Sequence, residues 1–160
     1  MIWGLTVSTF TSLHVVLSLI GIGAGLIVLF GLLDGRLRAG WNTLFLATTV
    51  ATSVTGFAFP TTRLLPSHVV GIISLVVLAV ALLARYPMGL AGAWRRIYVV
   101  SAAIALYLNI FVGVTQAFLK LPSLNALAPT QSEPPFAVAQ LVVLGLFGAL
   151  TLVAVKKARG

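Results

Sequence analysis

The side chains best suited to chemistry in this sequence are its two histidines, His14 and His68. A neutral imidazole binds haem iron or another metal through the ring nitrogen that lacks a hydrogen. The histidines lie near the starts of the first and third apolar runs, which would cross a membrane in the same direction, so both lie toward the same surface. First and third helices of a four-helix bundle are often diagonal neighbours. We therefore predict that His14 and His68 are the axial ligands of a b-type haem that transfers electrons within the membrane.

Two other roles for the histidines remain open. In the first, His68 caps or anchors a helix at the membrane surface, and His14 forms a hydrogen bond with Ser18 or an amide. In the second, Glu133 from an outer loop joins both imidazoles as a third ligand of a metal ion. The same carboxylate could instead pair with Arg63 or Lys120.

The amides Asn109 and Gln116 are seven residues apart and therefore share one face of a predicted helix. Amides avoid lipid, so this face should look into the bundle and donate hydrogen bonds to a bound cofactor. The alternative is that these groups only join helices to one another. Six further residues are predicted to line or cover the same pocket: Ser18, Thr52, Thr55, Gln140, Arg63 and Glu133.

The residue types that are missing exclude several classes of chemistry. The chain has no cysteine, which rules out disulfides, thiolate metal sites and thiol catalysis. Its two acids, Asp34 and Glu133, both lie outside the apolar runs, which argues against a proton-coupled transporter of the carboxylate type. The glycines from Gly21 to Gly25 lie in the middle of an apolar run, where they favour helix contact over phosphate binding.

Composition indicates a bilayer as the surrounding solvent. Of the 160 residues, 60% are hydrophobic and 8% are charged, and the mean hydropathy is +1.15. A soluble domain usually has about a quarter charged residues. The net charge of +8 would suggest nucleic acid for a soluble protein, but here it sets membrane topology, and no nucleic-acid partner is expected.

We expect an all-α fold, with residues 1–160 forming a single integral membrane domain, a polytopic bundle of five transmembrane helices. An apolar run of about 20 residues spans a bilayer, and five such runs cover approximately 9–33, 41–59, 67–83, 97–118 and 136–155. Eight of the ten basic residues fall on one side of these spans. By the positive-inside rule the N-terminus is outside and the C-terminus is cytoplasmic. The eight residues are Arg36, Arg38, Arg85, Arg95, Arg96, Lys156, Lys157 and Arg159.

Four segments, TSVTGFAFP, LLPSHVVGIISL, YLNIFVGVTQAFLKLP and APTQSEPPF, resemble an uncharacterised family of small bacterial five-helix inner-membrane proteins. The resemblance covers most of the chain. It implies a multi-pass protein of the bacterial inner (plasma) membrane, and it brings no activity, cofactor or site residue with it.

These patterns predict a polar pocket in the periplasm-facing half of the bundle, with haem b as its occupant. Two other functions compete with this prediction. The chain could be a non-catalytic subunit or assembly partner of a larger membrane complex, or a homo-oligomer, with the polar half as an interface. It could also be a permease that binds a small molecule or a lipid in the same pocket.

Overall fold

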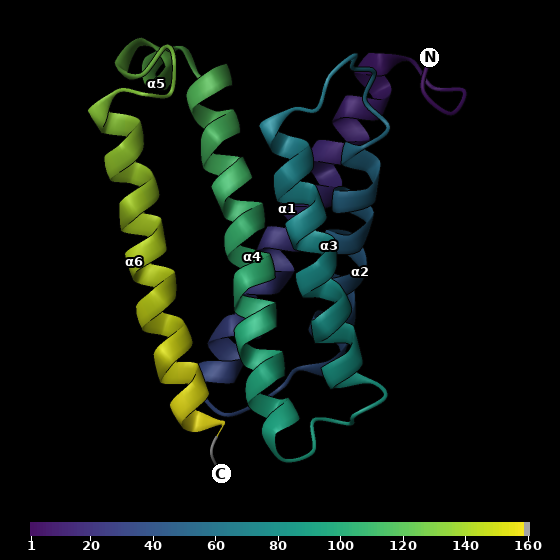
Figure 1. The fold of residues 1–160 in the computed structure, drawn as a ribbon, viewed down its shortest axis with the longest axis vertical. Helices are drawn as coiled ribbons and strands as arrows, with labels where there is room; N and C mark the ends of the chain where they lie inside the picture. The colour runs from purple at the N-terminus through teal and green to yellow at the C-terminus, as the bar shows by residue number, and fades with distance from the viewer. Residues whose placement is uncertain (159–160) are drawn as a thin grey trace.

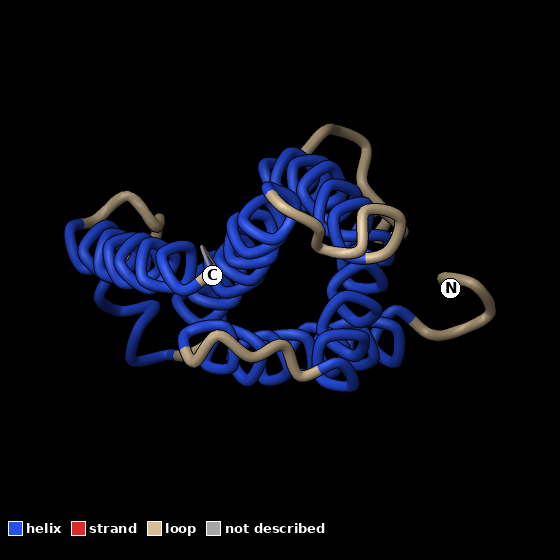
Figure 2. Tube along the Cα trace, turned by 90° about the horizontal axis from the view of Figure 1, so that it is seen from below, coloured by secondary structure: helices blue, strands red, loops and turns tan. Residues whose placement is uncertain are grey.

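The computed structural model describes residues 1–158, which form six helices. Figure 1 shows the five long helices running side by side, with the short helix α5 in the connection between α4 and α6. Figure 2, viewed from the end that carries the C-terminus, shows only helices and loops in the described part. The helices are α1 (Val7–Leu33), α2 (Ala39–Gly56), α3 (Pro66–Arg85), α4 (Ala93–Lys120), α5 (Pro122–Leu127) and α6 (Pro134–Lys157).

The predicted all-α fold is confirmed, and each predicted span corresponds to one long helix whose ends lie within four residues of the prediction. Helix α5 was not predicted. Its six residues follow directly on α4 after Leu121. Helices α3, α5 and α6 all begin at a proline. Proline suits the first turn of a helix because the N–H that it lacks would have no partner there.

Helices α1 to α4 form the main bundle. Helix α1 packs along α2 and α4, α3 packs against α4 and α2, and α6 lies at the edge against α4 with a smaller contact to α1. Buried side chains from the facing helices, such as Val28, Phe45, Leu78 and Leu106, fill the core between them. Helix α6 adds Phe147 and Ala154 to this core.

Close contact between α1 and its neighbours depends on Gly21 and Gly25. A Cβ atom at Gly25 would lie 2.6 Å from Cδ1 of Leu106 and 2.8 Å from Cδ2 of Phe45. A Cβ atom at Gly21 would lie 3.1 Å from Nδ2 of Asn109. The two glycines therefore let α1 approach α2 and α4 closely, as predicted for a glycine pair in the middle of a membrane.

Four helices, α1, α3, α4 and α6, are long and apolar enough to cross a membrane, which makes this a multi-pass membrane protein. Helix α2 is shorter and less apolar, since its 18 residues include Asn42, Ser53 and five threonines. The termini lie at opposite ends of the bundle (Figure 1). Seven of the eight basic residues predicted to share a side lie at the end with the C-terminus; the eighth, Arg159, is outside the described residues.

Candidate functional site

A cavity of about 100 Å³ lies between α1, α2, α3 and α4, near the end of the bundle that carries the N-terminus. Roughly 10–15 Å³ of such space is enough for one water, so the cavity has room for several waters or one small molecule. Polar side chains from all four helices line it: His14 and Ser18 from α1, Thr52 and Ser53 from α2, His68 from α3 and Asn109 from α4. We call this cavity the histidine pocket.

His14 is half-buried, and its Nδ1 lies 2.8 Å from Oγ1 of Thr55. The Thr55 hydroxyl donates its own hydrogen to the carbonyl oxygen of Ala51 at 2.7 Å. Because this hydrogen is already used, Thr55 accepts and His14 Nδ1–H donates. The neutral His14 ring therefore has its lone pair on Nε2, where it can accept a hydrogen bond or bind a metal.

His68 is the third residue of α3 and is buried, with 7% of its surface exposed. The backbone N–H of Leu65 donates to His68 Nδ1 at 3.0 Å. This bond satisfies an N–H group at the helix start that would otherwise lack a partner. Since Nδ1 accepts here, the neutral ring has its hydrogen on Nε2. His68 therefore offers a donor, whereas His14 offers an acceptor.

Ser18 and Asn109 join α1 to α4 at the wall of the histidine pocket. The Ser18 hydroxyl donates to Asn109 Oδ1 at 2.8 Å, and Asn109 Nδ2 donates to the Ser18 carbonyl oxygen at 3.4 Å. Both side chains line the cavity, and Asn109 is buried. The predicted inward orientation of Asn109 is therefore seen in the structure, and its first role is to connect helices.

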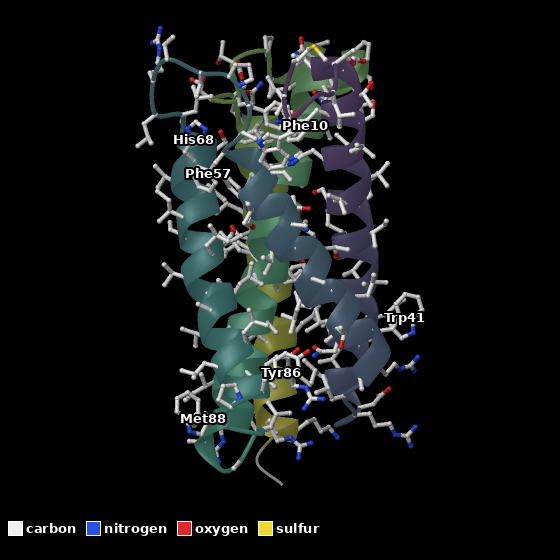
Figure 3. All side chains as sticks on the ribbon, turned by 90° about the vertical axis from the view of Figure 1, so that its right-hand side faces the viewer. Phe10, Trp41, Phe57, His68, Tyr86 and Met88 are labelled. Carbon is white, nitrogen blue, oxygen red and sulfur yellow. The ribbon has the colours of Figure 1, made fainter. Side chains whose placement is uncertain are left out.

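Aromatic rings surround both histidines. Phe57 stacks on His68 with ring centroids 5.5 Å apart and an angle of 17° between the planes (Figure 3). Phe59 meets His14 edge to face at 5.2 Å and contacts Phe10 in the same manner. These contacts hold the imidazoles in fixed orientations.

Thr52 provides the pocket with an unused polar atom. Its Oγ1 is buried and has no hydrogen-bond partner within residues 1–158, although Thr52 lines the cavity. A buried hydroxyl without a partner is destabilising, so a bound molecule or water that reached Thr52 would be stabilised there.

Five residues that were predicted for the site do not line the histidine pocket. Four were predicted as pocket or lid residues, and the fifth, Gln116, as a hydrogen-bond donor to the cofactor. Thr55 does not line the cavity but accepts the hydrogen bond from His14 Nδ1. Gln140 is buried and donates to Thr115 Oγ1 at 3.2 Å, which joins α6 to α4. The other three do not face the cavity: Gln116 and Arg63 are exposed, and Glu133 accepts hydrogen bonds within its own loop from Thr130 and Ser132.

Gln116 differs from Asn109 because of its position along α4. Near its end α4 packs against α6, where Gln140 donates to Thr115, but the side chain of Gln116 is exposed. Two turns separate Gln116 from Asn109. Sequence spacing alone gives the two residues the same face and cannot show which neighbouring helix each turn of α4 meets.

Several residues of the site were not predicted from the sequence. Ser67, Gly71 and Ser74 of α3 line the pocket at positions i, i+4 and i+7. This helical spacing is visible in the sequence and could have identified the two serines.

A separate polar contact lies at the opposite end of the bundle, where the Tyr98 hydroxyl donates to Oδ1 of the fully buried Asn42. Its members are 56 residues apart in the chain, so no local pattern marks it.

The two imidazoles differ in their ability to bind haem iron. Each axial ligand needs a ring nitrogen with a lone pair. His14 has one at Nε2, but His68 uses its lone pair to accept the Leu65 N–H. Binding iron through both rings would therefore require His68 to release Leu65. Within residues 1–158, no three His, Cys, Asp or Glu side chains lie close enough to hold a metal ion together.

Comparison of the chain with protein-family models, with curated proteins and with solved structures gave no match.

Proposed function

We propose that this protein lies in the bacterial inner membrane and binds a small, uncharged molecule in the histidine pocket, which opens toward the periplasm. All five long helices cross the membrane in this proposal, α2 included, because α2 lies between apolar neighbours that shield its threonines. The hydroxyls of Thr48, Thr49 and Ser53 donate to carbonyl oxygens of α2 itself, which lowers the cost of placing them in lipid.

The distribution of basic residues supports the orientation. The connections α1–α2 and α3–α4 and the end of α6 hold seven described bases, and these three segments lie at one end of the bundle. Of the bases that the structure describes, only Arg63 and Lys120 lie at the opposite end. By the positive-inside rule, the end with the histidine pocket faces the periplasm.

The chemistry of the pocket indicates the kind of molecule that it binds. His14 Nε2 accepts a hydrogen bond, His68 Nε2–H donates one, and Thr52 Oγ1 lacks a partner. Within residues 1–158, no acidic or basic residue lines the cavity other than the two histidines, and Phe57 and Val112 give it apolar walls. The best ligand is therefore a neutral molecule with at least one donor, one acceptor and an apolar surface. The observation that supports this proposal most is the convergence of both histidines on one cavity.

Haem b is a second candidate because both predicted ligands line the same cavity. It requires the rearrangement of His68 described above and a much wider pocket than the present cavity of about 100 Å³. The absorption spectrum of the purified protein distinguishes the two candidates: a Soret band that disappears in both His14→Ala and His68→Ala supports haem. A colourless protein that purifies within a stable larger assembly supports the role of a partner subunit.

The direct test is mass spectrometry of small molecules released from the purified protein. Ser53→Leu would fill part of the pocket, and Thr43→Leu is a matched control on the same helix. Each of these hydroxyls donates only to the carbonyl four residues before it, and Thr43 is outside the lining. The wild type and Thr43→Leu should release the same colourless small molecule, and Ser53→Leu should release at least tenfold less. Equal release from both variants, or none from the wild type, would contradict the proposal.

A further inference from the structure

A second, apolar groove lies between α3 and α4, separate from the histidine pocket and nearer the end with the C-terminus. Its volume is about 410 Å³. The walls are aliphatic, with Val76 and Val80 from α3 and Ile97, Val100 and Ile104 from α4. Each of these side chains is between 37% and 61% exposed, so nothing in the described chain covers the groove.

Arg96 is the one charged residue among the described residues that line this groove. It belongs to the first turn of α4 and is exposed. The preceding arginine is used differently: Arg95 Nη2 donates to the carbonyl oxygen of Gly35 at 3.2 Å. Neither of the two acidic side chains, Asp34 and Glu133, lines the groove. The guanidinium of Arg96 is therefore placed to meet an anion from outside the chain.

The length of the groove fits one leaflet of a bilayer. Arg96 and Ile104 are eight residues apart on α4, which is about 12 Å along the helix. One leaflet has about 15 Å of hydrocarbon. A molecule with a phosphate at Arg96 would therefore have an acyl chain beside Val100 and Ile104. Basic residues beside grooves between transmembrane helices on the cytoplasmic side bind anionic head groups.

We propose that this groove binds an anionic phospholipid of the cytoplasmic leaflet, with one acyl chain between α3 and α4 and the head-group phosphate on Arg96. A guanidinium donates two parallel hydrogen bonds to phosphate oxygens. The lipid covers the aliphatic side chains that the protein leaves exposed. The leaflet rests on the proposed orientation of the protein, but the site is separate from the histidine pocket, so its failure would leave the proposed ligand of that pocket untouched.

Native mass spectrometry from detergent tests the proposal, with phosphatidylglycerol and phosphatidylcholine of identical chains as probes. The wild type should retain phosphatidylglycerol about fivefold more strongly than phosphatidylcholine, the factor expected for one base near an anionic group. Arg96→Gln should remove this preference, and Arg96→Lys should restore most of it. Lys157→Gln, a base at the same end but outside the groove, should behave as the wild type.

Two further measurements in the same experiment identify the molecule that fills the groove. Val100→Trp, at an exposed position, should reduce retention of both lipids by filling the groove. Glycerol phosphate, the head group without chains, should neither bind nor compete. The proposal fails if the wild type shows no lipid preference or if Arg96→Gln matches Lys157→Gln. It also fails if glycerol phosphate displaces the lipid. A third contrary result is a wild-type dimer that shows no lipid preference and that Val100→Trp dissociates, because the groove would then be the dimer interface.

Discussion

Ser18 and Asn109 form a reciprocal pair, in which the Ser18 hydroxyl donates to Asn109 Oδ1 at 2.8 Å and Asn109 Nδ2 donates to the Ser18 carbonyl oxygen at 3.4 Å. The residues are 91 positions apart in the chain. The pair therefore holds α1 against α4 at the wall of the histidine pocket, and the shape of the pocket depends on it.

Asn109→Ala should lower the free energy of unfolding by about 1–2 kcal/mol, because two hydrogen bonds between helices are lost. Gln116→Ala is the matched control, since it removes an amide from an exposed position of the same helix and should change stability by less than about 0.5 kcal/mol. Reversible unfolding in mixed micelles measures both. Equal losses in the two variants would show that the Ser18–Asn109 pair contributes nothing.

Gly25→Ala should destabilise the bundle by about 1–3 kcal/mol, because the new methyl group overlaps Leu106 and the ring of Phe45. The distances of 2.6 and 2.8 Å leave no room for it. Gly23→Ala is two residues away on the same helix, and its Cβ would meet nothing within 4 Å. Gly23→Ala should therefore cause no loss in the same unfolding measurement. A loss for Gly23→Ala equal to that for Gly25→Ala would refute the close helix contact.

His68→Ala should weaken the first turn of α3 by about 1 kcal/mol, since the Leu65 N–H loses its acceptor. Hydrogen exchange at Leu65 should become roughly fivefold faster as a result, because this bond would open more readily. His68→Gln should restore slow exchange because a glutamine at this helix position can also accept the N–H. Fast exchange in both variants would mean that the imidazole does not cap α3.

The hydrogen bonds of Glu133 should make the stability of the loop before α6 depend on pH. Desolvation raises the pKa of this carboxyl, but hydrogen bonds from the Thr130 hydroxyl and from the backbone N–H groups of Thr130 and Ser132 outweigh it. The pKa therefore lies below the usual value for glutamate. A lowered pKa stabilises the folded loop fully above the usual value, and this stabilisation disappears as the pH falls through the lowered pKa.

Amide exchange of Thr130 and Ser132, corrected for the intrinsic pH dependence, measures this effect. Protection should fall on acidification in the wild type. In Glu133→Gln, the side chain keeps one of the two acceptor oxygens, so protection should be lower than in the wild type at neutral pH and should not change with pH. A wild-type profile without any pH dependence would contradict the carboxylate's role.

The long helices could be predicted from the sequence because each contains a long run without charged residues, and glycine, proline or basic residues separate these runs. Helix α5 was missed because its six residues, between Pro122 and Leu127, are too few for a periodic pattern. The end of α4 was placed two residues early, since Leu119 and Lys120 continue the helix beyond the apolar run.

The members of the site were easier to predict than their contacts. His14, Ser18, Thr52, His68 and Asn109 line one cavity, as their inward placement suggested. The alternative that His68 caps a helix is confirmed, because the Leu65 N–H donates to its Nδ1 at the start of α3. The predicted partner of His14 was wrong: it is Thr55 on another helix, not Ser18 or an amide. The contact between Asn42 and Tyr98 likewise depends on how α2 meets α4.

The central claim is that polar side chains from four helices enclose a pocket that opens to the periplasm. Because the chain has no cysteine, single cysteines can be labelled without background. Ser53→Cys lies in the pocket, and Ala91→Cys lies in the exposed loop between α3 and α4. In intact cells, a membrane-impermeant thiol reagent should label Ser53→Cys and spare Ala91→Cys, which should react only after permeabilisation. Labelling of Ala91→Cys in intact cells, or a Ser53→Cys that reacts under neither condition, would contradict the account.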